Sequence, residues 1–135
     1  MTEVLLDSDV IIAWLRGRQP AAEVIPELLA RGDTLTWTPV SIAEIFAGVR
    51  KGEEAAVSKL FLILDTLVLT AKVGKKAGEY LKSYSRSHGV ELGDALIAAA
   101  AHSKEIPLWT FNRKHYPMKD VCLFDPSNSL RDLGV

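Results

Sequence analysis

The apolar residues of this chain follow two repeating patterns. Short apolar runs bounded by polar or turn-forming residues predict buried β-strands, and apolar residues that recur every three or four positions predict amphipathic helices. The two patterns alternate along the chain. The predicted strands are residues 3–6, 35–38, 66–69, 107–111 and 121–124, and the predicted helices are residues 8–16, 20–31, 39–51, 53–64, 71–88 and 92–104.

Alternation of short apolar strands with amphipathic helices is typical of an α/β fold in which helices cover both faces of a parallel sheet. The sequence contains no internal repeat, low-complexity tract or linker, so residues 1–135 are predicted to form a single domain. Residues 127–135 are expected to form a peripheral tail.

Composition agrees with a soluble globular protein, because 48% of the residues are hydrophobic and 24% are charged. No apolar stretch is long enough to cross a membrane. The apolar run at residues 10–15 is short, lacks a preceding basic region and follows Asp7 and Asp9, which argues against a secretory signal. The single cysteine, Cys122, excludes an internal disulfide and favours a reducing compartment, so a cytoplasmic location is expected.

The net charge of −1 argues against a protein that holds nucleic acid by bulk electrostatic attraction. Any contact with nucleic acid is therefore expected to be local, or brief and catalytic. Basic residues nevertheless gather in two segments, and each segment is either a solvated helix face or a local contact surface. These residues are Lys72, Lys75, Lys76, Lys82 and Arg86, followed by Arg113, Lys114, His115 and Lys119.

Four polar residues occupy similar places relative to the predicted strands. Asp7 ends the first strand, Glu44 lies in the first turns of the helix after the second strand, Asp94 lies near the start of the alanine-rich helix, and Asn112 follows the fourth strand. Ligands of open parallel sheets bind outside the carboxyl ends of the strands. These four side chains are therefore predicted to converge at one edge of the sheet.

Each of these residues also has a structural interpretation. Asp7, together with Asp9, could cap the first helix, and Asn112 could cap a short helix that follows it. The segment at residues 41–44, SIAE, matches a capping box that would give Glu44 a structural role. Asp94 in a first helical turn is favoured by the helix dipole.

The four residues together favour a metal site over separate caps. Two carboxylates about 5 Å apart repel by roughly 3 kcal/mol at an effective dielectric constant near 20. A hard divalent cation with oxygen ligands offsets this repulsion, and Mg²⁺ needs only one or two carboxylates besides water and a substrate phosphate. Such a site is suited to phosphodiester hydrolysis.

Other candidate sites are weaker. The spacing of His88, His102 and His115 does not suit zinc, and Cys122 lies in an apolar predicted strand, where packing is the usual role. Trp37 and Trp109, which also lie in predicted strands, are expected in the core.

Four segments resemble the PIN-domain family, and specifically its VapC-type toxins. They are residues 5–12 (LLDSDVII), 41–48 (SIAEIFAG), 93–99 (GDALIAA) and 110–116 (TFNRKHY). The resemblance covers nearly the whole chain, and the four segments occur in the family's order. It implies a three-layer α/β/α sandwich with a parallel five-strand sheet.

The resemblance also implies a function. It implies a Mg²⁺-dependent endoribonuclease, in which Mn²⁺ substitutes, acting as the toxin of a toxin–antitoxin pair. It implies a homodimer, and a small antitoxin that blocks the site and binds operator DNA. Carried over by position, Asp7, Glu44 and Asp94 match the acidic, metal-binding triad.

Three further residues are assigned by the same resemblance. Asn112 stands where many relatives carry a fourth acid, which argues against a second tightly held metal ion. Thr110 and Arg113 are the candidates for substrate binding, and Asp9 is a candidate for an assisting role.

Three alternative functions remain for comparison. The Asp7–Ser8–Asp9 pattern resembles the paired aspartates of haloacid dehalogenase-type phosphatases, but that family also needs a lysine and an acidic pair late in the chain, where Asp94 stands alone. A receiver domain needs an aspartate at the end of the third strand, and Asp65 precedes that strand. A PIN fold used only as a binding module is disfavoured by the acidic triad.

Overall fold

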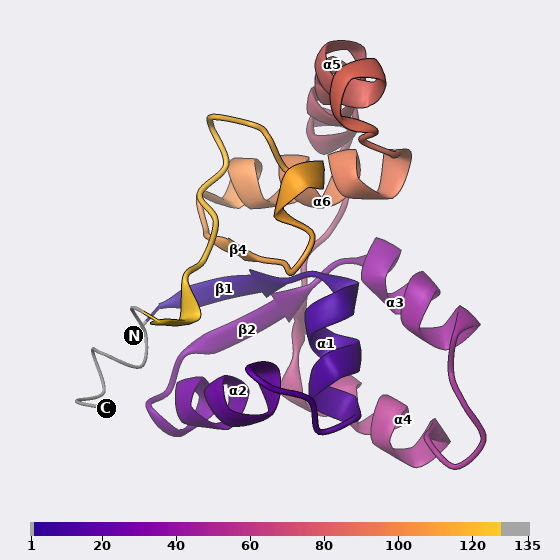
Figure 1. Cartoon of the computed structure of the whole chain (residues 1–135), viewed down its shortest axis with the longest axis vertical. Coiled ribbons are helices and arrows are strands. Elements are labelled where there is room, and N and C mark those ends of the chain that lie inside the picture. Colours follow the sequence, from indigo (N-terminus) through magenta and orange to yellow (C-terminus); the bar gives the residue numbers. More distant parts are fainter. Residues whose placement is uncertain (1, 128–135) are drawn as a thin grey trace.

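The computed structural model describes residues 2–127, in which helices and short strands alternate (Figure 1). The predicted tail therefore lies outside the described residues, apart from Ser127. The strands are β1 (Glu3–Leu6), β2 (Thr34–Trp37), β3 (Asp65–Thr66) and β4 (Leu108–Trp109). The helices are α1 (Ser8–Leu15), α2 (Ala21–Ala30), α3 (Pro39–Ala47), α4 (Glu54–Ile63), α5 (Ala71–His88) and α6 (Leu92–Lys104), with a short 3₁₀ helix, η1 (Arg113–His115).

The four strands form one parallel sheet in the order β3-β2-β1-β4. The predicted parallel α/β fold is therefore confirmed. The fifth predicted strand, residues 121–124, is not part of this ladder, and the expectation of five strands is corrected to four. Its pairing is limited to a single parallel bridge between Leu108 and Leu123, because β4 is only two residues long and offers no longer edge.

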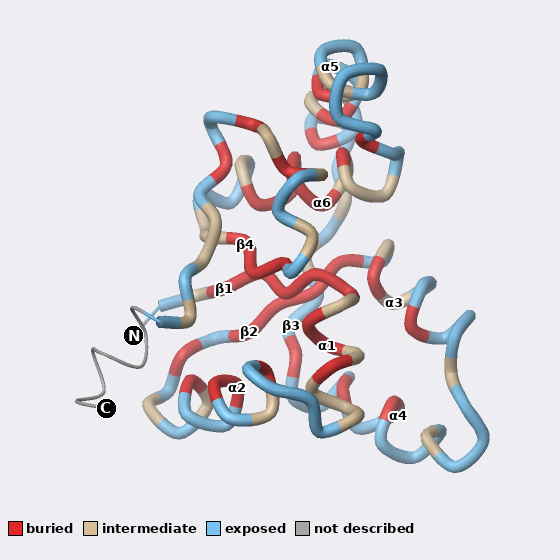
Figure 2. The backbone as a smooth tube through the Cα atoms, in the orientation of Figure 1, coloured by how far each residue is buried: buried red, intermediate tan, exposed pale blue. Residues whose placement is uncertain are grey.

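Helices cover both faces of the sheet, which gives three layers. One hydrophobic cluster joins β1 and β2 to α1, α2, α3 and α4, and a second cluster joins β1 and β4 to α5 and α6. In Figure 2 the buried positions accordingly follow β1, β2 and the helix faces turned toward them. Consecutive residues of β1 point to opposite clusters, with Val4 and Leu6 in the first and Leu5 in the second.

Local signals determine where several helices begin and end. The Thr70 hydroxyl accepts a hydrogen bond from the Val73 N–H and caps α5, and Gly89 ends this helix in the left-handed conformation with φ +66°. Helices α5 and α6 consequently have the bounds that the sequence predicts. Within residues 2–127, no helix is both long and apolar enough to cross a membrane.

Candidate active site

Asp7 is held in place by three donors at the point where β1 ends. Its Oδ2 accepts hydrogen bonds from the Thr110 hydroxyl at 2.8 Å and the Tyr116 hydroxyl at 3.0 Å, and its Oδ1 accepts one from the Ser8 N–H at 2.8 Å. Burial raises the pKa of Asp7, and the charge of Asp94 raises it further, while the three hydrogen bonds act in the opposite direction. The side chain is thus a rigidly oriented carboxyl group close to a second acid.

Glu44 is linked to the same point through Ser8. The Ser8 hydroxyl donates to Glu44 Oε1 at 2.8 Å and lies 3.1 Å from the Ser41 hydroxyl. The capping-box interpretation of Glu44 is wrong, because the residue that caps α3 is Thr38, whose hydroxyl accepts from the Ser41 N–H. Glu44 therefore lies beyond the first turn of α3, exposed at the edge where Asp7 lies.

Asp94 has a structural role as well as a place in the site. In the first turn of α6, its Oδ2 accepts a hydrogen bond from the Glu91 N–H at 3.0 Å, and this pair forms a capping box. The same oxygen lies 3.3 Å from His115 Nδ1. The charge of Asp94 raises the pKa of both Asp7 and Tyr116, so its carboxylate lies near both side chains.

Asn112 stands at the start of η1 but does not cap it with its side chain. Its Nδ2 lies 2.8 Å from His115 Nδ1, and its N–H donates to the Thr110 hydroxyl at 3.0 Å. The Thr110 hydroxyl is therefore occupied by Asp7 and Asn112, so a substrate would have to compete for it. Arg113 is exposed on η1, and its predicted contact with substrate stays a prediction.

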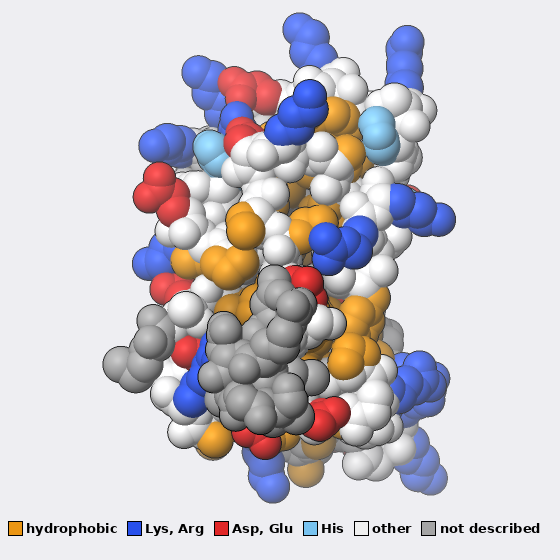
Figure 3. Space-filling view, turned by 60° about the vertical axis from the view of Figure 1, so that its left-hand side comes forward, with side chains coloured by type: hydrophobic (Ala, Val, Ile, Leu, Met, Phe, Trp, Pro, Cys, Tyr) orange, Lys and Arg blue, Asp and Glu red, His pale blue; other side chains and the backbone are white. Residues whose placement is uncertain are grey.

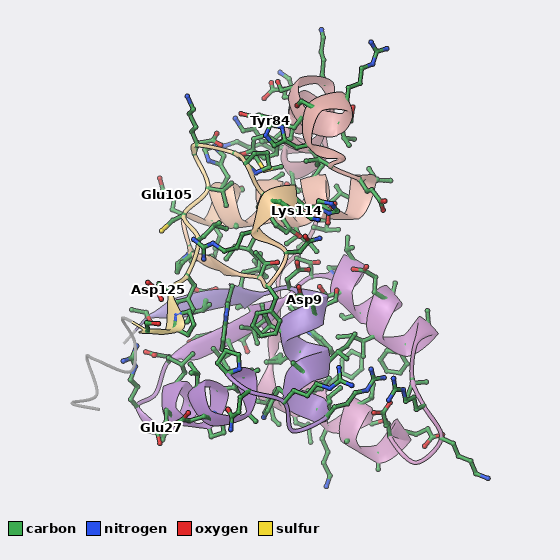
Figure 4. The ribbon with its side chains drawn as sticks, viewed as in Figure 1. Asp9, Glu27, Tyr84, Glu105, Lys114 and Asp125 are labelled. Carbon is green, nitrogen blue, oxygen red and sulfur yellow. The ribbon has the colours of Figure 1, made fainter. Side chains whose placement is uncertain are left out.

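Asp9 lies where β1 passes into α1 (Figure 4). Its Oδ2 accepts a hydrogen bond from the Phe111 N–H at 3.1 Å, whereas its Oδ1 is buried and has no partner among the described residues. Burial, followed by the charge of Asp7, raises the pKa of Asp9 to about 6. The carboxylate thus carries an oxygen that is both desolvated and unpaired.

This arrangement predicts that Asp9→Asn stabilises the metal-free protein at neutral pH. The pKa of Asp9 is about 6 in the folded protein against an ordinary value of 3.8. Its contribution to stability is therefore fully present below about pH 4 and is lost as the pH rises through 6. The amide keeps an oxygen for the Phe111 N–H and removes the charge, so we expect a gain of about 1–2 kcal/mol at pH 7.5 after allowing for partial screening by solvent.

Urea unfolding with a chelator present, at pH 4 and pH 7.5, measures this difference. Asp65→Asn, which removes the same charge from an exposed residue, is the matched control and should change little. Equal unfolding free energies for Asp9→Asn and the native chain at pH 7.5 would contradict the assignment of Asp9 as a desolvated acid.

The carboxyl groups at this edge fit a hard divalent cation. The donor set is made of carboxylate oxygens, one of which is orphaned in a buried position, and Asp7, Asp9 and Glu44 form no salt bridge within residues 2–127. In the part of the chain that the structure describes, no three histidine, cysteine or acidic side chains are placed so as to hold a metal between them. Mg²⁺ does not require three such side chains, because it needs only one or two carboxylates and keeps several waters.

Three contributors to this edge were not assigned a role from the sequence. Ser8 links Asp7 to Glu44, Tyr116 orients Asp7, and His115 lies between Asp94 and Asn112. His115 and Tyr116 belong to the last of the four family-like segments, so that segment contained the available signal. Burial raises the pKa of Tyr116, which keeps its hydroxyl protonated and able to donate.

A parallel α/β/α sandwich with acidic side chains at the carboxyl end of its sheet is the class defined by this fold and site. The chain matches the model of the PIN domain over residues 4–121, and it belongs to the PIN family. Ribonucleases of this family are in general metal-dependent. Family membership leaves no support for the phosphatase and receiver-domain alternatives.

Known proteins resemble the chain over most of its length. It is 38% identical over 117 residues to Ribonuclease VapC10 of Mycobacterium tuberculosis, covering 85% of this chain and 86% of that protein. It is 32% identical over 115 residues to Ribonuclease VapC19 of the same species, covering 84% and 92%. The DNA-bound VapBC structure from Salmonella typhimurium has the same fold, with a TM-score of 0.77, 20% identity, and coverage of 93% of this chain and 99% of that one.

Proposed function

We propose that this protein is a Mg²⁺-dependent endoribonuclease, the toxin component of a VapBC-type toxin–antitoxin pair, in which Mn²⁺ can substitute. The observation that supports the proposal is that Asp7 lies near two other acids: Ser8 donates its N–H to Asp7 and its hydroxyl to Glu44, and the charge of Asp94 raises the pKa of Asp7. The identity to two ribonucleases over more than four-fifths of the chain supports it.

Each residue of the edge has a proposed role. The metal ion, when bound, would make a bound water more acidic and stabilise negative charge on the reacting phosphate. Asp7 and Asp94 would bind it directly, and Glu44, oriented by Ser8, would complete the ligand set. Thr110 and Tyr116 fix the orientation of Asp7 by donating to its Oδ2. Asn112 would donate a hydrogen bond to a phosphate oxygen or to the attacking water.

Metal binding should raise the melting temperature if these carboxylates form the site. A ligand at 100 times its dissociation constant adds about 2.7 kcal/mol, which corresponds to roughly 5–15 °C for a domain of this size. We expect Mg²⁺ or Mn²⁺ to produce such a shift and to activate cleavage of RNA, and we expect a chelator to reverse both effects. Differential scanning calorimetry and an RNA cleavage assay measure them.

Asp7→Asn tests the assignment of the ligands. The amide keeps an oxygen for the Thr110 and Tyr116 hydroxyls, although its NH2 group then faces the Ser8 N–H, and it loses the charge that attracts the cation. Its metal-induced shift in melting temperature should therefore be much smaller than that of the native chain. Asp65→Asn, an exposed acid on β3, should retain the full shift. A native chain that binds and folds normally but shows no metal-dependent cleavage of any RNA would favour the remaining alternative, a PIN fold that only binds.

The proposed partners follow from the same assignment. The Salmonella relative was crystallised as a VapBC complex on DNA. We propose a cognate antitoxin that blocks the acidic edge and carries operator binding, a homodimer of this chain, and a cytoplasmic site of action. Helices α3 and α4 offer an apolar surface for such contacts, because Phe46, Phe61, Leu62 and Ile63 are 40–88% exposed.

A further inference from the structure

Helix α5 carries a stripe of basic side chains on its outer face. With 3.6 residues per turn, these positions fall within about one third of the helix circumference. The opposite face, with Val73, Ala77 and Tyr80, is buried in the second hydrophobic cluster. We define the basic stripe as Lys72, Lys75, Lys76, Lys82 and Arg86.

The charge of this helix is unlike that of the rest of the protein. Of sixteen lysine and arginine residues in the chain, five lie in α5, which contains a single acid, Glu79. An ordinary solvated helix face mixes charges of both signs, because pairs of opposite sign stabilise the helix. The stripe therefore concentrates positive charge on a molecule whose total charge is −1.

Most of this charge is not neutralised within the protein. Lys76 is paired with Asp120 at 3.0 Å and with Glu79 at 3.7 Å. Within residues 2–127, Lys72, Lys75, Lys82 and Arg86 form no salt bridge, and all four are exposed. In Figure 3 Lys and Arg side chains project from the upper end of the molecule, which is the end where α5 lies in Figure 1.

The end of α5 that carries Arg86 adjoins the candidate active site through the backbone at Gly89. Arg86 lies in the last turn of α5, and Gly89 follows the helix directly. A Cβ at Gly89 would stand 4.0 Å from His115 Nε2, and His115 Nδ1 lies 3.3 Å from Asp94 Oδ2. From there the stripe leads away from the carboxylates for roughly 21 Å to Lys72, given a rise of about 1.5 Å per residue.

We propose that the basic stripe binds the phosphate backbone of the RNA strand beyond the scissile phosphate. The inference rests on the proposed ribonuclease function and adds to it a second contact region for the substrate. At about 3.4 Å per nucleotide of a stacked strand, the stripe would accommodate about six nucleotides. Flexible lysines contact the phosphate charge and not the base edges. The stripe should therefore increase the affinity for longer RNA whatever its sequence.

RNA is the occupant that the geometry favours over duplex DNA or an acidic protein. An RNA strand that is cut at the acidic edge extends beyond it on at least one side. The end of α5 that carries Arg86, which forms no salt bridge among the described residues, lies near this edge. A charged track that continues from the carboxylates is suited to a strand already held there. Duplex DNA has no such reason to start at His115 and Asp94. A protein segment that blocks the carboxylates, as proposed for the antitoxin, would need positive charge there, and the cations of the stripe would repel its continuation.

The test compares two triple variants with equal changes of charge, each made in an Asp94→Asn background so that bound RNA is not cut. The stripe variant is Lys75→Gln, Lys82→Gln and Arg86→Gln. The control variant is Lys51→Gln, Lys59→Gln and Arg18→Gln, which removes one arginine and two lysines from exposed positions elsewhere. Fluorescence anisotropy measures the binding of single-stranded RNA of about 4 and about 14 nucleotides over a range of salt concentrations.

The stripe variant should bind the longer RNA about tenfold more weakly at low salt, and the slope of log K against log salt should fall by about 2, since each lost phosphate contact on a single strand contributes about 0.7. The shorter RNA should bind both variants equally, and the control should keep the slope of the parent. Unchanged affinity and slope in the stripe variant would overturn the proposal.

Two further outcomes separate this inference from the function on which it rests. A stripe variant that loses affinity for duplex DNA as strongly as for single-stranded RNA would overturn RNA as the occupant. With Asp94 restored, the stripe variant should keep the native kcat/KM on the shorter RNA and lose about tenfold on the longer one. If the native chain cuts no RNA but still binds longer RNA more tightly through the stripe, the proposed ribonuclease function is wrong and the proposed RNA-binding role of the stripe is supported.

Discussion

Asp94→Asn is expected to reduce RNA cleavage by about 10³-fold or more while leaving the fold intact, because it removes the charge of a proposed metal ligand. Asp94 also has a structural role, because its side chain accepts a hydrogen bond from the Glu91 N–H at the start of α6. The amide oxygen of asparagine can accept the same hydrogen bond, so the stability should change by less than about 1 kcal/mol. Activity and stability are thus separated at a residue that serves both.

Asn112→Ala provides the comparison for this prediction. It removes a side chain that can donate one hydrogen bond to a phosphate or water, but no charged ligand, so we expect only about a tenfold loss. The two variants are compared by their initial rates of cleavage of the same RNA at saturating Mg²⁺, and circular dichroism of each variant checks that it is folded. Cleavage at the native rate by Asp94→Asn would refute its role as a metal ligand, and an Asn112→Ala variant as inactive as Asp94→Asn would refute the assignment of a single well-held metal ion.

Trp37→Ala is expected to cost about 4–5 kcal/mol, a large part of the 5–15 kcal/mol that stabilises an ordinary domain. The indole is fully buried at the end of β2, and Phe61 of α4 packs edge-on against it with ring centroids 5.0 Å apart. Its Nε1 also donates to the Thr66 hydroxyl at 2.9 Å, which ties β2 to the two-residue strand β3. The truncation therefore leaves a cavity and also removes the hydrogen bond to Thr66.

Urea unfolding followed by circular dichroism measures this loss. Leu62→Ala is the control on the neighbouring helix, since its side chain is 88% exposed and its removal should change the unfolding free energy by less than about 0.5 kcal/mol. A Trp37→Ala variant within about 1 kcal/mol of the native chain would mean that this tryptophan does not hold the edge of the sheet, contrary to the large cost of removing buried aromatic side chains elsewhere.

The helices of this protein are largely determined by local sequence. The apolar periodicity and the terminal signals at Thr70 and Gly89 act within a few residues of the backbone that they direct. Helices α5 and α6 accordingly begin and end where the pattern predicts. The alternation of strands with helices is a similar signal, since a parallel sheet needs a crossover after each strand.

The lengths of the strands depend on their neighbours. Residues 66–69 and 107–111 have the composition of strands, yet only Thr66 of the first segment and Leu108–Trp109 of the second lie in strands, and β3 begins one residue earlier than predicted, at Asp65. A strand extends only as far as an adjacent strand offers hydrogen-bonding partners, and no pattern within one segment contains that information. The single bridge at Leu123 has the same cause.

The candidate site likewise has features that the sequence predicts and features that only the tertiary structure shows. Residue type and position relative to the strands were enough to select Asp7, Glu44, Asp94 and Asn112, because the carboxyl ends of parallel strands share one edge. The caps are local contacts, but the sequence left their assignment open: Asp7 is the N-cap residue of α1, Thr38 caps α3 in place of Ser41, and Asp94 completes the capping box of α6. The hydrogen bond from Tyr116 to Asp7 spans 109 residues of sequence, and it exists only because folding places β1 beside the segment that follows β4. Local propensity acts over one or two helical turns, so the sequence alone could determine the elements and the candidate acids, whereas the partners that orient each acid were decided by the packing of distant segments.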